Sequence, residues 1–275
     1  MINKIKYSLN QHLLIFVITM FLFTILVTFL SEPYGINLIS TSFVKVLGKT
    51  LCLCIAAVAM DVVWGYCGIL SLGHCAFFGL GGYMIGMWLM YERTELIVLN
   101  SINEQQLPLT PSELKEAIGN QIFGVVGGKE IPNIWIFADN IYIQLLLVVL
   151  VPGVFAFIFG WLAFRSRVTG VYLSILTQAM TLALSLYLFQ NDSGLRGNNG
   201  LSGLQNIPHI EGLGQPTISI WFFWFSSISL LLTLFIFKFI LSSKFGSVIT
   251  AVRDNETRLR FFVYNVESYK LFIFV

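Results

Sequence analysis

Charged residues are scarce in this chain. They make up 11% of its 275 residues, compared with about a quarter in soluble proteins. Hydrophobic residues make up 56%, and the mean hydropathy is +0.81. This composition excludes an ordinary soluble domain and predicts an all-α protein, a polytopic bundle of transmembrane helices. The formal net charge of +2 is too small to indicate a nucleic-acid partner.

The residue patterns of common active sites are also missing from the sequence. No Cys/His spacing suits zinc, and the four cysteines lie in apolar surroundings, where thiols behave as small hydrophobic side chains: Cys52, Cys54, Cys67 and Cys75. The segment GVVGGKE is not a phosphate-binding loop, because Phe123 replaces its first glycine and Glu130 its hydroxyl residue. Paired carboxylates and a nucleophile with a base are lacking. The sequence therefore predicts no catalytic residue, no metal site and no cofactor.

Six apolar runs approach the length of about 20 residues that a helix needs to cross a bilayer: 13–30, 44–63, 71–91, 141–164, 170–189 and 218–241. The first has no small-residue cleavage site, so we expect an uncleaved span. Polar segments at 92–140, with a short helix at 112–123, and at 191–216 are the expected external loops. The chain is thus predicted to be a single transmembrane domain over residues 1–275.

Basic residues are unevenly spread over the predicted loops, and cytoplasmic loops carry an excess of Lys and Arg. Six spans counted from a cytoplasmic N-terminus leave four basic residues outside: Arg93, Lys115, Lys129 and Arg196. The remaining basic residues of the loops fall inside: Lys4, Lys6, Arg165, Arg167, Lys238, Lys244, Arg253, Arg258, Arg260 and Lys270. Because span count and charge bias agree, we expect a cytoplasmic N-terminus and a cytoplasmic segment at 242–270.

The stretch 64–91 combines seven glycines with one histidine in apolar surroundings. A glycine inside a helix costs roughly 1 kcal/mol relative to alanine, so such a stretch indicates close backbone approach or an interrupted helix near 65–91. An interrupted helix in lipid must face protein or a water-filled cavity. We therefore expect a substrate pathway here, with Ser71, His74, Gly81 and Gly82 as candidates. Gly82 and Gly86 form the expected close-approach pair, and His74 alone is more often a structural hydrogen-bond partner.

Polar residues also interrupt the fifth apolar run. Ser174, Thr177, Gln178 and Thr181 are spaced to lie along one helical face. Such a face either hydrogen-bonds a neighbouring helix or lines a path, and we take Ser174 and Gln178 as pathway candidates. Asn198 and Asn199 are candidates for contact with arriving substrate or a binding protein, although their NNG context is equally typical of a turn.

Three segments of the sequence are distinctive: DVVWGYCGILSLGHCAFFGLGGYMIGMWLM at 61–90, GVYLSILTQAMTLAL with GNNGLSG within 170–203, and FGSVITAVRDNETRLRFFVYNVESYKLFIF at 245–274. Together they resemble the permeases of ATP-binding-cassette importers, in the branched-chain amino acid permease family. ILTQA and GNNGLSG are most similar to urea permeases of that family. Relatives continue beyond a span of which 271–275 is only the start, so the resemblance implies an incomplete final span, from a fragment or a disrupted or split reading frame.

The resemblance also implies partners and a location. Such permeases lie in the inner (plasma) membrane, pair with a second related permease, receive substrate from an extracytoplasmic binding protein and are driven by cytoplasmic ATP-binding subunits. It implies that a short helix in the cytoplasmic segment docks on the ATPase, which makes these residues coupling candidates: Arg253, Asp254, Asn255, Glu256 and Arg258. The alternative for this segment is contact with anionic membrane lipid.

Four functions remain to be compared. A urea permease needs fixed donors and acceptors in a tight cavity, whereas a branched-chain amino acid permease must also neutralise a carboxylate and an ammonium group. The predicted spans lack an obvious central charge, which favours urea. A passive channel or ion-coupled carrier needs no docking segment and would transport without ATP hydrolysis. An intramembrane enzyme is the least favoured because no catalytic constellation is found.

Overall fold

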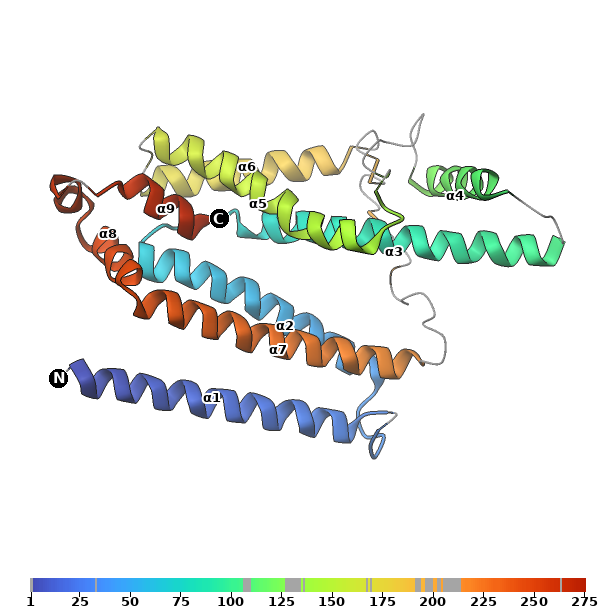
Figure 1. Ribbon diagram of the computed structural model, residues 1–275, viewed down its shortest axis with the longest axis horizontal. Helices are drawn as coiled ribbons and strands as arrows, with labels where there is room; N and C mark the ends of the chain where they lie inside the picture. The colour runs from blue at the N-terminus through green and yellow to red at the C-terminus, as the bar shows by residue number, and fades with distance from the viewer. Residues whose placement is uncertain are drawn as a thin grey trace. The chain divides into compact units, whose positions relative to one another are not determined.

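A computed structural model describes residues 2–32, 34–105, 110–126, 135, 137–166, 168, 170–190, 194–195, 200–201, 204, 214–262 and 264–275 (Figure 1). The described residues are mainly helical and contain no β-strand beyond one isolated bridge between Ser31 and Ile39. The all-α prediction is confirmed. The chain divides into two compact units, one of Met1–Val62 with His209–Val248 and one of Val63–Pro208 with Ile249–Val275.

The first unit is built from α1 (Ile2–Leu30), α2 (Thr41–Asp61) and α7 (Gln215–Ser242). Helices α2 and α7 pack along each other, and α1 contacts α7 (Figure 1). Their shared core is apolar: Val27, Val44, Leu51, Ile220, Phe223 and Leu230. One polar contact is added by the Trp224 indole, which donates to Thr28 Oγ1 at 2.9 Å. This unit is therefore held together mainly by side-chain packing.

The second unit begins just after the start of a π-helix, η1 (Val62–Tyr66), and contains α3 (His74–Gln105), α4 (Pro111–Val126), α5 (Ile141–Arg165), α6 (Val171–Leu188) and α9 (Val266–Phe274). Helix α8 (Lys244–Phe261) runs into it from the first unit. Helix α3 packs against α4, α5 and α6, and α9 packs against α5. The core is rich in methionine and aliphatic residues: Met84, Met87, Met90, Val98, Ile118, Ile122, Trp135, Ala138 and Leu195.

Helix α3 differs from the prediction at both ends. The expected interruption lies before it, at residues 68–73, and α3 itself is continuous from His74. It also runs past residue 91 to Gln105, so the segment taken as a loop from 92 is helical there and again in α4, which contains the helix expected at 112–123. In this part of α3 Val98 is buried in the core, and Ile102, one turn later on the same face, packs against it. Burial of this apolar side extends the helix.

Within the part of the chain that the structure describes, five helices are long and apolar enough to cross a membrane: Leu13–Leu30, Thr41–Tyr66, Ile141–Arg165, Val171–Leu188 and Gln215–Ser242. Helix α3 is not among them, because its glycines and His74 dilute its apolar residues. The third predicted span, 71–91, therefore stays a prediction. Several basic residues used for the predicted orientation lie outside the described residues: Lys129, Arg167 and Arg196.

The close approach expected at Gly82 occurs one residue earlier. A Cβ added to Gly81 would lie 3.3 Å from the Val148 carbonyl oxygen of α5, whereas a Cβ at Gly82 would meet nothing within 4 Å. A Cβ added to Gly86 would lie 3.2 Å from Leu201 Cδ1. Neighbouring residues on a helix point about 100° apart, so only one of the two adjacent glycines can face α5. Within this chain the close contact therefore falls on Gly81, because spacing alone does not fix which face of a helix is covered. A close approach at Gly82 stays a prediction.

We expect Gly81→Leu to destabilise the protein more than Gly82→Leu does. Both replacements gain the same helix propensity, but leucine at position 81 must displace α5, and such overpacking costs about 1–3 kcal/mol. Thermal unfolding of the two purified variants in the same detergent measures the difference. Equal unfolding temperatures would contradict the assignment of Gly81 to the contact.

Candidate functional site

The glycine-rich stretch contains a break between η1 and α3. Gly68 has a φ of 71°, a left-handed conformation that glycine adopts without steric cost. Around it, Gly68 N donates to Trp64 O at 3.0 Å and Ile69 N to Val63 O at 3.2 Å, which closes the end of the π-helix. The chain then runs without helical structure from residue 68 to 73. Its peptide groups consequently need partners from elsewhere.

Hydroxyl groups of α6 supply two of those partners. Ser174 Oγ donates to Leu70 O at 2.8 Å, and Leu72 N donates to Thr177 Oγ1 at 3.1 Å. Both hydroxyl residues are buried. Of the two roles open to the polar face of 170–189, hydrogen bonding to a neighbouring segment is therefore the one that Ser174 and Thr177 make here.

The remaining pathway candidates are placed differently. Gln178 is exposed, whereas Ser174, one turn before it on the same helix, is buried. Ser71 is buried within the break, and its hydroxyl accepts a long bond of 3.4 Å from Gly73 N. Asn198 and Asn199 lie outside the described residues. The break thus brings Ser71 and Ser174 into one region and leaves Gln178 on the surface of this chain.

His74 opens α3 directly after the break. Its ring meets the edges of Phe77 and Phe274, with ring centroids 6.0 and 5.8 Å away. Its Nδ1 atom is buried and has no hydrogen-bond partner of standard geometry among the described residues. The contacts of His74 are therefore with the rings of Phe77 and Phe274 and with the backbone of Ser71. Its role as a structural hydrogen-bond partner stays a prediction.

The segment predicted to couple to an ATPase forms two helical pieces. Asn255 has an extended backbone inside α8 (φ −158°, ψ 86°) and divides it into 244–254 and 256–261. The Asn255 Oδ1 atom accepts a hydrogen bond from Arg258 N at 3.1 Å, as an N-cap residue does at the start of a new helix. A kink therefore separates Arg253 and Asp254 from Glu256 and Arg258.

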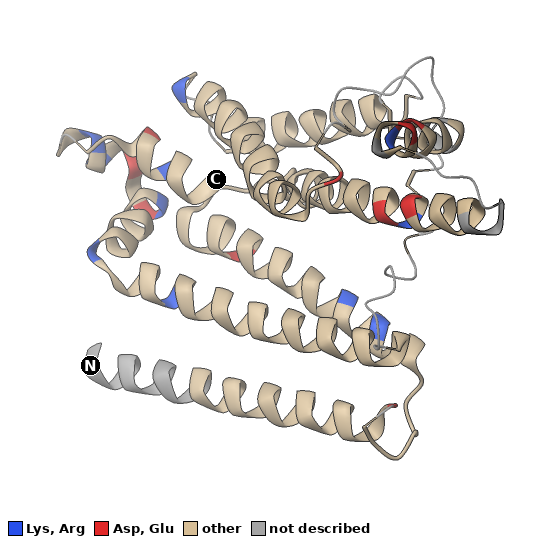
Figure 2. Ribbon diagram, turned by 45° about the vertical axis from the view of Figure 1, so that its right-hand side comes forward, with Lys and Arg blue, Asp and Glu red and all other residues tan. Residues whose placement is uncertain are grey.

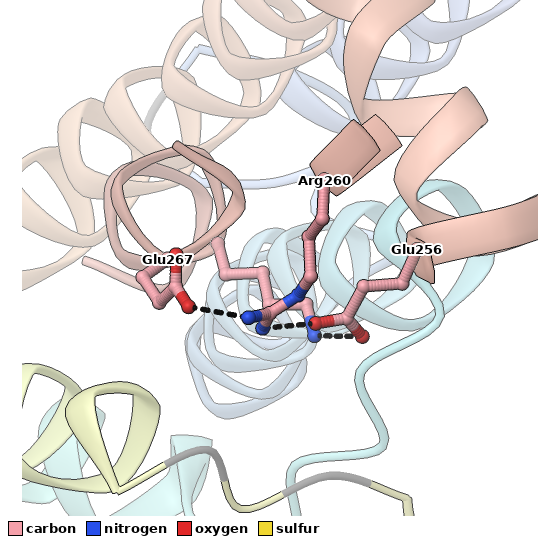
Figure 3. Close-up of polar contacts among 4 residues, drawn as sticks. Glu256, Arg260 and Glu267 are labelled. Atoms are coloured by element: carbon pink, nitrogen blue, oxygen red, sulfur yellow. Dashed lines mark hydrogen bonds and ion pairs between the residues drawn. The ribbon is translucent and has the colours of Figure 1, made fainter. Parts of the chain in front are cut away.

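Ion pairs join the second piece of α8 to α9 (Figure 3). Glu256 contacts Arg260 at 2.8 Å and Lys270 at 2.7 Å, and Arg260 also contacts Glu267 at 3.0 Å. Partial burial by itself raises the pKa of the Glu256 carboxyl, but the hydrogen bonds and charges of Lys270 and Arg260 outweigh it and hold this pKa below the ordinary value. Glu256 is thus ionised at neutral pH and pairs the mostly buried Lys270.

Arg253 binds the backbone near the break. Its Nη1 atom donates to Gly65 O at 2.7 Å, while Nε and Nη2 both donate to Asp254 Oδ1 at 3.1 Å. A small cavity of about 160 Å³ lies at this junction. Its lining includes both the break and the charged segment: Cys67, Gly68, Ile69, Gly170, Leu173, Val252, Arg253, Asp254, Asn255, Glu256 and Lys270.

Two residues that the sequence prediction did not single out are conspicuous here. Phe261 is the last residue of α8 and Phe262 follows it, and their side chains are 83% and 69% exposed. Figure 2 shows that α8 and α9 carry many of the charged residues, as do α4 and the later part of α3. The sequence RLRFFVYN already shows this pair of aromatic residues within a polar segment. Exposed aromatic side chains of this kind are typical of interaction surfaces.

A family model described as branched-chain amino acid transport system, permease component, matches residues 42–275. The chain belongs to this family. The match covers residues of both units, and with five apolar helices it supports a multi-pass membrane protein that acts as a transport subunit rather than an enzyme. Such permeases generally work with ATP-binding and substrate-binding partners. No curated protein and no solved structure gave a significant match.

We expect Thr177→Val to destabilise the protein more than Thr181→Val. Valine at 177 leaves Leu72 N without its acceptor, and an unsatisfied buried group costs about 1–3 kcal/mol. Thr181 is the matched control because its hydroxyl donates only to Thr177 O within the same helix, at 2.9 Å. Denaturant unfolding in detergent measures both variants, and a larger loss for Thr181→Val would argue against the role of the α6 hydroxyls.

Proposed function

We propose that this chain is one permease subunit of an ATP-driven importer and that, with a second related permease, it forms a membrane pathway for urea. The general part follows from the family match, while urea is the finer proposal. The observation that supports it is the chemistry around the break, where hydroxyls and peptide groups are close together. Among the described residues the only buried charged side chain is Lys270, which is paired with Glu256.

A neutral polar substrate suits such surroundings. Urea offers only donors and acceptors, so hydroxyls and backbone groups can replace its hydration. We propose Ser71, His74 and Ser174 as contacts beside the backbone of Gly81 and Gly82. Gln178 contributes only if the partner permease completes the path on that face, and Asn198 and Asn199 are proposed for the external entrance.

The family description fits a branched-chain amino acid substrate equally well. Such a substrate carries a carboxylate and an ammonium group, and a site for it needs opposing charges or helix ends. The proposal of urea rather than an amino acid therefore rests on one observation: the described part of the second unit contains no buried charge without a partner.

The substrate is tested by uptake into proteoliposomes that contain this chain, its partner permease, the ATP-binding subunits and the binding protein. We expect ATP-dependent uptake of radiolabelled urea that excess unlabelled leucine does not reduce. Leucine uptake with no urea uptake would favour the amino-acid permease. Urea uptake that persists when the ATP-binding subunits carry a hydrolysis-blocking substitution would indicate a passive channel.

We further propose that residues 242–270 face the cytoplasm and that the N-terminus lies on the same side, in the inner membrane. The placement of basic residues supports this orientation. On that side the tip of α8, with Phe261, Phe262 and the exposed Arg258, is available to dock on an ATP-binding subunit. Aromatic and arginine side chains are the usual anchors of protein interfaces.

We expect Phe261→Ala with Phe262→Ala to reduce co-purification of the ATP-binding subunits at least about tenfold, because two interface anchors of more than 1 kcal/mol each are removed. Phe157→Ala is the control, since Phe157 is an exposed phenylalanine of α5, a predicted span. Unchanged co-purification of the double variant would contradict docking by this tip. If the double variant keeps co-purification but binds anionic lipid vesicles more weakly, the tip contacts lipid.

A further inference from the structure

We propose that Arg253 is a positioning residue that ties the coupling segment to the broken helix, rather than a residue that contacts the ATP-binding subunit. This inference deepens the proposed docking function and depends on it for its role in transport. Its structural basis is the bond of 2.7 Å from Arg253 Nη1 to Gly65 O. Gly65 lies in η1, three residues before the residue at which the break begins.

The backbone near Gly65 and the Arg253 side chain suit each other in both hydrogen bonding and shape. The last carbonyl groups of a helix lack intrahelical partners, and an arginine guanidinium is well suited to supply donors to them. The side chain also packs against Gly68, where an added Cβ would lie only 2.8 Å from Arg253 Cγ and 3.4 Å from its Cβ. Gly68 is therefore needed twice, for its positive φ and for the space that the arginine stem occupies.

The guanidinium group is also held in orientation. Nε and Nη2 donate to Asp254 Oδ1, which leaves Nη1 directed to the carbonyl of Gly65. Asp254 is 64% exposed at its side chain, so its charge alone contributes little to stability. We infer that Asp254 orients Arg253, and this assigns a different role to each of two adjacent residues that the family resemblance groups together.

The kink at Asn255 separates the contact between Arg253 and Gly65 from the proposed docking tip. Phe261, Phe262 and Arg258 lie after the kink, and Arg253 lies before it. A partner that binds the tip acts on the second piece of α8, while Arg253 carries displacement of the first piece to Gly65 and Gly68. From there the chain passes directly into the residues that Ser174 and Thr177 hold. Movement at the docking tip is thereby linked to the region proposed for substrate.

Arg253→Met separates this role from docking because methionine keeps an unbranched stem beside Gly68 and loses every donor. We expect amide exchange of residues 64–72 in the full chain to become about tenfold faster, as loss of a hydrogen bond from a charged donor predicts. Arg253→Lys, which keeps one donor, should recover part of this protection. Arg258→Met is the matched control, and exchange at 64–72 should stay at its original rate.

The same variants are then compared in the assembled importer. Arg253→Met should co-purify with the ATP-binding subunits as the unchanged chain does, but transport about tenfold less urea per ATP hydrolysed. Arg258→Met should weaken co-purification without changing that ratio. If the unchanged importer takes up leucine and not urea, radiolabelled leucine replaces urea in this ratio.

Each outcome bears on one claim. If the rate of amide exchange at 64–72 is unchanged in Arg253→Met, Arg253 does not stabilise the backbone near Gly65. This conclusion holds whether or not the segment docks. If amide exchange is faster but the ratio of transport to ATP hydrolysis is unchanged, Arg253 has no role in coupling. The same conclusion follows if transport falls only in proportion to the loss of bound ATP-binding subunits. If instead the tip variants leave co-purification intact, the proposed docking fails, and the exchange measurement still decides the contact between Arg253 and Gly65.

Discussion

A helix that stops among apolar neighbours must find new partners for its peptide groups, and the second unit depends on how this chain meets that requirement. Each buried peptide group left without a partner costs about 1–3 kcal/mol. Between η1 and α3 the partners are Ser174 and Thr177 of α6, with Arg253 at the helix end. The break is consequently a defined structure with specific contacts, and any movement of it must exchange these hydrogen bonds.

Packing and polar contacts are divided between the two units. In the first unit α2 and α7 share an apolar core to which one indole hydrogen bond is added. In the second unit the break and the charged segment provide most of the specific polar contacts described above. Ion pairs that are partly buried require a partner of opposite charge. Removal of Glu256 therefore leaves the mostly buried Lys270 without its ion-pair partner, whereas removal of Lys270 leaves Glu256 paired with Arg260. The junction of α8 with α9 is for this reason most sensitive to the loss of Glu256.

Composition was sufficient to predict the all-α fold, and the family match confirms the resemblance to the branched-chain amino acid permease family. The positive φ of Gly68 fits the expectation that the glycine-rich stretch contains an interruption. Face assignments were less predictable. Gly81 rather than Gly82 meets α5, and Gln178 is exposed although Ser174 on the same helical face is buried, because the covered arc of a helix depends on neighbours distant in sequence. Residues 92–105 were assigned to a loop from their charges, although Val98 packs in the core.

Three arginines within eight residues show why a segment's chemistry does not follow from its composition. Arg253 binds a backbone carbonyl and Arg260 joins two glutamates, whereas the Arg258 side chain is exposed and forms no ion pair among the described residues. The extended residue Asn255 rotates the second helical piece relative to the first, so regular helical spacing cannot predict which way each arginine points. Since a bound guanidinium must break existing contacts before it can meet a partner, Arg258 is the arginine best placed for an external interface.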